Sequence, residues 1–168
     1  VLGELAGVYG PVKPVPESLL IYEDSIRITD LEINVMQTPG HAPHHLSFQI
    51  DNLLFAGEAF GVTVPETDRF YLRPATPPVF KYAVYSRSIR TLMQLDDPVV
   101  CFGHYGSHDD LPGLARAAMQ QLDLWMEEIV EATDSDDAHT DSAVFERLLK
   151  CDPYMKGFTD LPEDIRRR

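Results

Sequence analysis

The sequence predicts an α+β domain in which an antiparallel-rich sheet is covered by helices. Three observations support this fold class. A series of short β-like segments separated by turn residues occupies positions 19–56. An apolar stripe with helical spacing runs from Leu114 to about Ala132. A short apolar segment, 99–102, lies between these two regions and is typical of a strand buried on both faces.

Short strands make up the first part of the chain. Five segments favour extended structure: 19–22, 25–28, 32–37, 46–50 and 53–56. Glu23-Asp24 suits a hairpin turn between the first two segments, and Asp51-Asn52 suits a turn between the last two. Since strands joined by such short turns pair antiparallel, we expect a meander.

The character of the sequence changes after residue 60. Residues 62–79 contain four prolines and have no clear period, so we expect a long surface loop or lid there. In 79–95 the apolar positions approximate a helical spacing, which Asp96-Asp97-Pro98 would end.

Two further helices are predicted near the end of the chain. Asp109-Asp110 can cap the helix that carries the long apolar stripe, with Pro112 in its first turn. An acidic break separates it from a shorter helix over 142–150. The tail, ending in Arg166-Arg167-Arg168, is expected to be an interrupted helix or a disordered end.

Composition narrows the classes of function. The chain has 168 residues, enough for one domain with a substantial core. Its 14 basic and 27 acidic residues give a formal net charge of −13. Nucleic acids and anionic membranes require a positive protein face, so this charge argues against both. We expect a small-molecule substrate instead.

The cysteine content and the lack of targeting signals predict a cytoplasmic protein. Cys101 and Cys151 are too few for a disulfide framework and too far apart for a Cys-x-x-Cys motif. No apolar run has the length of a membrane span, and the first residues do not form a signal peptide.

Three candidate metal ligands each follow a predicted strand, with glycine directly before them. They are His41, Glu58 and His104. Strands that end at a common rim can bring such side chains together, and imidazole with carboxylate suits zinc, iron or manganese. A single loop histidine or glutamate is more often an ordinary hydrogen-bonded group. The order His, carboxylate, His at three strand ends favours a metal site, with zinc as the expected ion.

Three more histidines lie beside these ligands in the sequence. His44, His45 and His108 are expected to support the metal ligands or to face the substrate rather than to bind metal directly. His139 lies in the acidic break and receives no role.

These motifs resemble the C-terminal motifs of the metallo-β-lactamase superfamily. The resemblance rests on Thr38-Pro39-Gly40-His41 with His45, on Phe55-Ala56-Gly57-Glu58-Ala59 and on Phe102-Gly103-His104, and it covers roughly residues 15–130. It implies the C-terminal half of an αββα sandwich over 1–133, followed by a truncated helical extension over 134–168. It also implies that His41 and His104 ligate metal ions and that Glu58 bridges them.

The sequence departs from the family pattern in two ways. Glu58 stands where the family normally has the shorter Asp, so the bridging geometry and the choice of metal could shift. The family's His-x-His-x-Asp-His motif, which supplies much of the metal site, is absent. Because the chain also lacks an initiator Met, we expect it to be a piece of a longer protein, shortened by design or by proteolysis.

The resemblance implies a metal-dependent hydrolase. In that family one or two metal ions lower the pKa of a bound water, and the hydroxide attacks an ester, thioester, lactam or phosphoester. Arg69, Tyr71 and Arg73 are candidates for recognising an anionic group, with a solvated charged loop as the alternative. As an incomplete fragment, the isolated chain is expected to be inactive, and it could lack bound metal altogether.

Two other functions stay open at this point. One is an iron-binding redox member of the same superfamily, which the carboxylate-rich site suggests. The other is a non-enzymatic half-domain that associates with itself. A half-domain must cover its cut face, so we expect a homodimer or a complementing N-terminal half.

Overall fold

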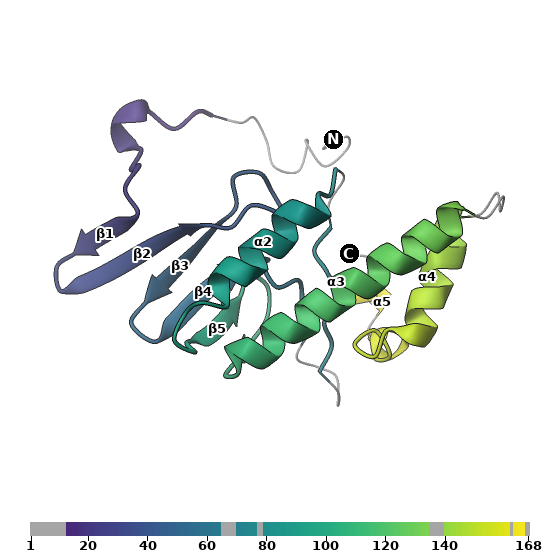
Figure 1. Ribbon diagram of the computed structural model, residues 1–168. Helices are drawn as coiled ribbons and strands as arrows, with labels where there is room; N and C mark the ends of the chain where they lie inside the picture. The colour runs from purple at the N-terminus through teal and green to yellow at the C-terminus, as the bar shows by residue number, and fades with distance from the viewer. Residues whose placement is uncertain (1–12, 65–69, 77–78, 135–139, 162, 167–168) are drawn as a thin grey trace.

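A mixed sheet with helices on one face forms the centre of the chain (Figure 1). The structure is a computed structural model that describes residues 13–64, 70–76, 79–134, 140–161 and 163–166. Within these residues the sheet has six strands, which lie side by side in the order of the sequence. They are β1 (Ser25–Ile28), β2 (Leu31–Gln37), β3 (Leu46–Ile50), β4 (Leu53–Gly57), β5 (Val99–Phe102) and β6 (Ser107–His108). The predicted fold class is confirmed.

The pairing of the strands determines where the candidate ligands meet. Strands β1 to β4 form the predicted antiparallel meander, whereas β4 and β5 pair in parallel. A parallel pair requires a long crossover, and the connection over 58–98 contains a helix, as such crossovers usually do. The carboxyl ends of β4 and β5 therefore lie at the same edge of the sheet.

The helices follow the predicted pattern closely. The α-helices are α2 (Tyr82–Leu92), α3 (Leu111–Thr133), α4 (Thr140–Cys151) and α5 (Glu163–Arg166), and short 3-10 helices are η2 (Glu17–Leu19) and η3 (Phe158–Asp160). The side chain of Asp110 caps α3, because it accepts a 2.7 Å hydrogen bond from the backbone N–H of Gly113. Pro112 lies in the first turn, where no intrahelical hydrogen bond from its nitrogen is needed.

The main core lies between the sheet and the two helices α2 and α3. Leu54 and Val100 project from the central strands, Ile89 from α2 and Leu111 from α3, and all four side chains are 0% exposed. In a strand, alternate side chains point to opposite faces. Because Leu54 points to the core, the side chains of Leu53 and Phe55 point to the other face of the sheet. The helices thus cover one face of the sheet only (Figure 1).

The opposite face of the sheet is apolar and open in the described part of the chain. Cross-strand register aligns two rows of side chains there: Ile26, Ile33, Ile50, Leu53 and Val99, and Val35, Phe48, Phe55 and Cys101. None of these nine side chains is buried. Leu53 is 40% exposed and Phe55 is 41% exposed. We call these two rows the open sheet face.

The predicted strand over 19–22 is wrong. Glu17–Leu19 forms the 3-10 helix η2, and the next residues are irregular, with Ile21 and Tyr22 exposed. A strand needs a partner, and no strand among the described residues pairs with this segment. The hairpin turn is also not at Glu23-Asp24. It lies between β1 and β2, where Thr29 takes a left-handed conformation with φ of 54°.

Two predictions about burial also require correction. The described part of 62–79 does not lie wholly at the surface: Tyr71 is 2% and Leu72 0% exposed, and Val62 and Arg73 pair in a β-bridge. Prolines disfavour regular structure here without preventing burial. Positions 65–69 and 77–78 lie outside the described residues. Strand β5 is not buried on both faces, because Val100 alone among its residues is buried; its other face is open.

The segment after α3 folds back along that helix. Arg147 in α4 forms ion pairs with Glu128 and Glu131 in α3. Asp152, 0% exposed, accepts hydrogen bonds from Trp125 Nε1 at 2.7 Å and from Gln121 Nε2 at 2.8 Å. The helix predicted over 142–150 is confirmed as α4, and the division of the chain at residue 133 stays a prediction. No helix in the described ranges is both long and apolar enough to cross a bilayer.

Candidate functional site

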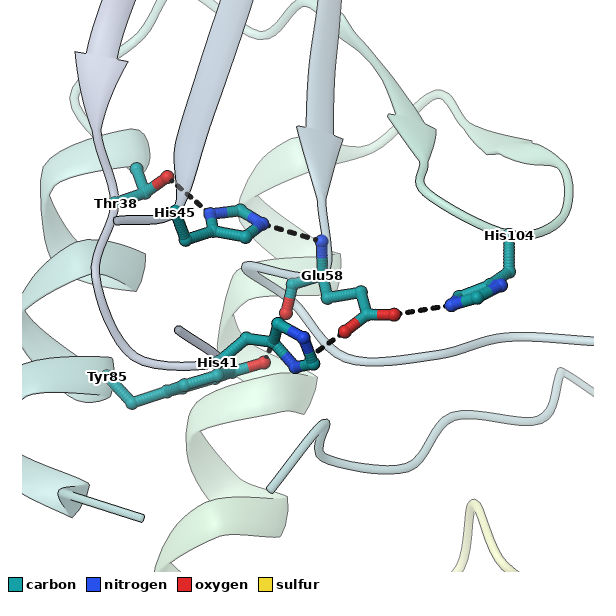
Figure 2. A network of polar contacts seen from close by, with 6 residues as sticks. All are labelled: Thr38, His41, His45, Glu58, Tyr85 and His104. Carbon is teal, nitrogen blue, oxygen red and sulfur yellow. Dashed lines mark hydrogen bonds and ion pairs between the residues drawn. The ribbon is translucent and has the colours of Figure 1, made fainter. Parts of the chain in front are cut away.

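The three predicted ligands lie together at one edge of the sheet. His41 follows β2, Glu58 follows β4 and His104 follows β5. Figure 2 shows the Glu58 carboxylate between the two imidazole rings. Oε2 of Glu58 is 2.5 Å from Nδ1 of His41, and Oε1 contacts Nε2 of His104. The structure thus brings the three residues together, and their role as metal ligands stays a prediction.

One of these contacts is not a hydrogen bond. His41 Nδ1 and Glu58 Oε2 are both buried, and neither atom has a hydrogen-bond partner despite the 2.5 Å between them. The two atoms are close enough for an ion pair. However, no N–H group is aligned between them as a hydrogen bond requires. A cation placed against both atoms would give each of them a partner.

The donor atoms fit metal ions by their chemistry but are too few to complete a site. Each carboxylate oxygen of Glu58 faces one imidazole, which provides two ligands for each of two ions. Zinc sites in proteins use three or four protein ligands. Consistent with this shortfall, no group of three or more His, Cys, Asp or Glu side chains among the described residues is arranged to hold a metal ion.

A chain of hydrogen bonds fixes the position of Glu58. Its backbone N–H donates to Nε2 of His45 at 3.1 Å, and Nδ1 of His45 lies 2.9 Å from the hydroxyl of Thr38 (Figure 2). Thr38 in turn contacts the Ser47 hydroxyl at 2.8 Å, and Ser47 donates to the carbonyl of Ala56 at 3.3 Å. Burial, followed by the neighbouring His41, lowers the pKa of His45 below its ordinary value. A neutral imidazole is the form that can accept from Glu58.

Close packing explains the glycines that precede the ligands. A Cβ on Gly57 would lie 2.5 Å from Nε2 of His45, and Gly57 has a left-handed φ of 58°. A Cβ on Gly40 would lie 2.4 Å from Cδ2 of Tyr85. The glycines thus allow the loops to approach their neighbours as well as to turn.

Comparison with known proteins identifies the family. The family model described as "Metallo-beta-lactamase superfamily" matches residues 5–104. The chain belongs to the metallo-beta-lactamase superfamily. Proteins of this superfamily usually bind metal ions. The matched range includes all three candidate ligands, so the sequence resemblance and the family assignment rest on the same part of the chain.

Relatives of this superfamily member are longer than the chain. It is 34% identical over 110 residues to metallo-beta-lactamase fold-containing protein ST1585 of Sulfurisphaera tokodaii, a match covering 63% of this chain and 41% of that protein. The crystal structure of ST1585 from Sulfolobus tokodaii is similar with a TM-score of 0.56 and 23% identity, covering 95% of this chain and 60% of that chain. Family protein TTHA1429 from Thermus thermophilus has a TM-score of 0.57 and 21% identity, covering 74% and 40%.

Sequence analysis missed two residues on helix α2 of this superfamily chain. Both hydrogen-bond to the loops that carry the candidate ligands. The Tyr85 hydroxyl donates to the backbone carbonyl of Glu58 at 2.5 Å, and the Ser88 hydroxyl donates to the carbonyl of Pro39 at 2.6 Å. Burial raises the pKa of Tyr85, so its hydroxyl keeps its proton. The sequence could have indicated a role for Ser88, because a small polar residue at a buried position of a helix is unusual. A hydroxyl contact such as that of Tyr85 has no signature in a single sequence.

The three other histidines predicted for the site of this superfamily chain, His44, His45 and His108, lie in different environments. His45 accepts a hydrogen bond from the backbone N–H of Glu58, and its role beside a metal stays a prediction. His44 is exposed. His108, in β6, packs against Phe70 at a ring distance of 5.1 Å and accepts a hydrogen bond from the backbone N–H of Asp110. Neither His44 nor His108 lines the cavity beside Glu58.

A cavity of about 560 Å³ adjoins the candidate ligands of this superfamily chain. His41, Glu58 and His104 are among its lining residues. Arg73 lines it as well, as do apolar side chains from the C-terminal segment. Tyr71, also in the wall, has its pKa raised to about 12, mainly by burial, with the nearby Arg73 opposing the rise. Arg69, the other predicted anion-binding arginine, lies outside the described residues.

Proposed function

We propose that this chain carries part of the active site of a metal-dependent hydrolase that cleaves an ester, thioester or related bond. The observation that supports it most directly is the pair of buried atoms, His41 Nδ1 and Glu58 Oε2, which face one another without a hydrogen bond. A carboxylate oxygen and an imidazole nitrogen that lie close together at strand ends are suited to a shared cation. Membership of the superfamily supports the same proposal.

In this proposal His41, Glu58 and His104 are the residues of this chain that would hold the metal. His45 orients Glu58 through the backbone N–H, and Tyr85 holds the carbonyl of the same residue. A bound divalent ion supplies Lewis acidity and a water molecule that ionises near neutral pH. Imidazole and carboxylate donors favour zinc, with iron or manganese as the alternatives.

The proposal includes inactivity of the isolated chain. Each ion would receive two ligands from the described residues, which is fewer than a stable catalytic site requires. The chain spans 41% of the length of the curated relative that it matches, so the remaining ligands would come from the rest of the domain. Measurable metal-dependent ester hydrolysis by the isolated chain would contradict this part.

The test is metal binding to the full chain and to two variants. Calorimetric titration with zinc should show weak binding to the unmodified chain and its loss in Glu58→Gln, which removes the charge of the carboxylate. Glu127→Gln makes the same charge change at an exposed position on α3 and should leave binding unchanged. Equal binding by all three proteins would contradict the proposal. Iron rather than zinc in the purified chain would favour the redox alternative.

The open sheet face supports a proposal about the partner. We propose that a second layer from the rest of the domain covers it, and that the isolated chain associates with itself through the same face. Sedimentation should then show a concentration-dependent dimer. Phe55→Glu should abolish it, because a charge would have to be buried. Val130→Glu, at a 51% exposed apolar position on α3, is the matched control. A dimer that survives Phe55→Glu would overturn this proposal.

A further inference from the structure

Two arginines, Arg73 and the exposed Arg166, line the cavity beside the candidate ligands, and Arg73 is an unpaired charge held within the fold. Arg73 is half-buried and lines the cavity, and within the described residues it forms no ion pair. This is notable in a chain of net charge −13, in which Arg27 and Arg147 do pair with glutamates. The β-bridge between Val62 and Arg73 fixes the Arg73 backbone beside the segment that follows Glu58. A cation in this position is available to a ligand.

Another part of the wall is apolar and comes from the C-terminal part of the chain. Trp125, Met155, Phe158 and Leu161 line it, and they belong to a cluster separate from the main core. These residues are positioned by buried hydrogen bonds rather than by the sheet. Gln121 donates from Nε2 both to the carbonyl of Leu72 at 2.6 Å and to Asp152 at 2.8 Å, which joins the loop, α3 and the C-terminal segment.

We propose that this cavity binds an anion with an apolar body, such as a medium-chain acyl or aryl carboxylate. The anionic group lies against Arg73, and the apolar body lies against Trp125 and Phe158. The volume of about 560 Å³ is in the range of small-molecule sites. If the proposed hydrolase function holds, the substrate is an ester or thioester with these two features, and its reacting bond lies beside Glu58. Binding itself does not depend on that function.

The chain contains a built-in reporter for this binding. Trp125 is its only tryptophan and lines the cavity, so a ligand there should change the intrinsic fluorescence. The full chain is titrated with octanoate and, separately, with 1-octanol, which has the same apolar body without the charge. A chelator is present throughout, so the result is independent of metal binding. We expect saturable binding of both, with octanoate about tenfold tighter because of one charge-assisted hydrogen bond.

Two variants distinguish the parts of the cavity. Arg73→Gln should remove the preference for octanoate and leave the affinity for octanol unchanged. Arg166→Gln, at the exposed second arginine of the wall, should keep that preference. Arg87→Gln, at an exposed position of α2, makes the same charge change and should have no effect. Phe158→Ala should weaken both ligands to a similar extent, and circular dichroism checks that each variant is folded. Equal affinity for the two ligands, an unchanged preference in Arg73→Gln, or no saturable fluorescence change would each overturn the proposal. Failure of the zinc titration would leave this inference standing.

Discussion

The backbone N–H of Glu58 donates a hydrogen bond to Nε2 of His45. This bond determines the direction of the hydrogen bonds that connect His45 to Thr38 and Ser47. Because Nε2 accepts, a neutral His45 carries its proton on Nδ1 and donates to Thr38. Thr38 must then donate to Ser47, whose own proton goes to the carbonyl of Ala56. The series starts and ends on the same strand terminus, so the position of Glu58 depends on each member.

Thr38→Val should destabilise the chain by roughly 1–3 kcal/mol, because it leaves the Nδ1 proton of His45 without an acceptor and Ser47 without its donor. Thr38 is 1% exposed, so water cannot replace the lost hydroxyl without rearrangement. Thr38→Ser keeps the hydroxyl and is the matched control. Urea unfolding measures both. Equal loss in the two variants would mean that packing of the methyl group, and not the hydroxyl, stabilises this region.

Gly57→Ala should cost more than Gly106→Ala. Both glycines have a left-handed φ, 58° and 71°, but a Cβ on Gly57 would meet His45 at 2.5 Å, whereas one on Gly106 meets nothing within 4 Å. Gly106→Ala therefore measures the backbone cost alone, roughly 1 kcal/mol. The excess in Gly57→Ala measures the close approach to His45. Unfolding free energies that agree within error would contradict this packing.

Asp152→Ala should destabilise the C-terminal segment by roughly 3 kcal/mol, because hydrogen bonds to a charged acceptor are lost and their donors stay buried. The donors are Gln121, Trp125 and the backbone N–H of Tyr154. Asp152→Asn keeps one acceptor oxygen and should cost less, and Asp96→Ala at an exposed position is the control. Thermal unfolding followed by Trp125 fluorescence would reveal the loss. An unchanged midpoint would show that this network contributes no stability.

Tyr71 should make stability fall at high pH. Its pKa is about 12 in the folded chain, against about 10 for an unfolded tyrosine. Between these values the unfolded chain has lost the proton and the folded chain has kept it, so stability decreases as pH rises. The contribution is complete below pH about 10 and is lost above about 12. Urea midpoints across this range should decline less steeply in Tyr71→Phe, with the exposed Tyr22→Phe as control. Identical slopes would contradict the assignment.

The sequence predicted the elements that follow strong local patterns. The meander from β1 to β4 has apolar alternation and turn residues, and α3 has both a cap and a stripe, so these are specified by neighbours in the sequence. The ligands His41, Glu58 and His104 could be grouped because each follows a strand. The segment 19–22 was mispredicted because its apolar residues suit a strand whose partner is missing, and partners are not local information.

The cavity wall could not be predicted, because it depends on contacts between distant segments. Tyr71, Trp125 and Phe158 come from three regions of the chain that share no pattern. Asp152 lies before a proline and gives no indication in the sequence that it is fully buried. Its burial follows from donors on α3, 27 and 31 residues earlier.

The parallel pairing of β4 with β5 has a consequence for the order of folding. His45 and Glu58 are 13 residues apart, whereas Glu58 and His104 are 46 apart. Closing the longer loop costs about 1 kcal/mol more in chain entropy, and long-range pairing slows folding. We expect the His41–Glu58 part of the site to form first, and His104 to join after the crossover helix has docked. A chain stalled between these steps would hold a carboxylate with one imidazole beside it.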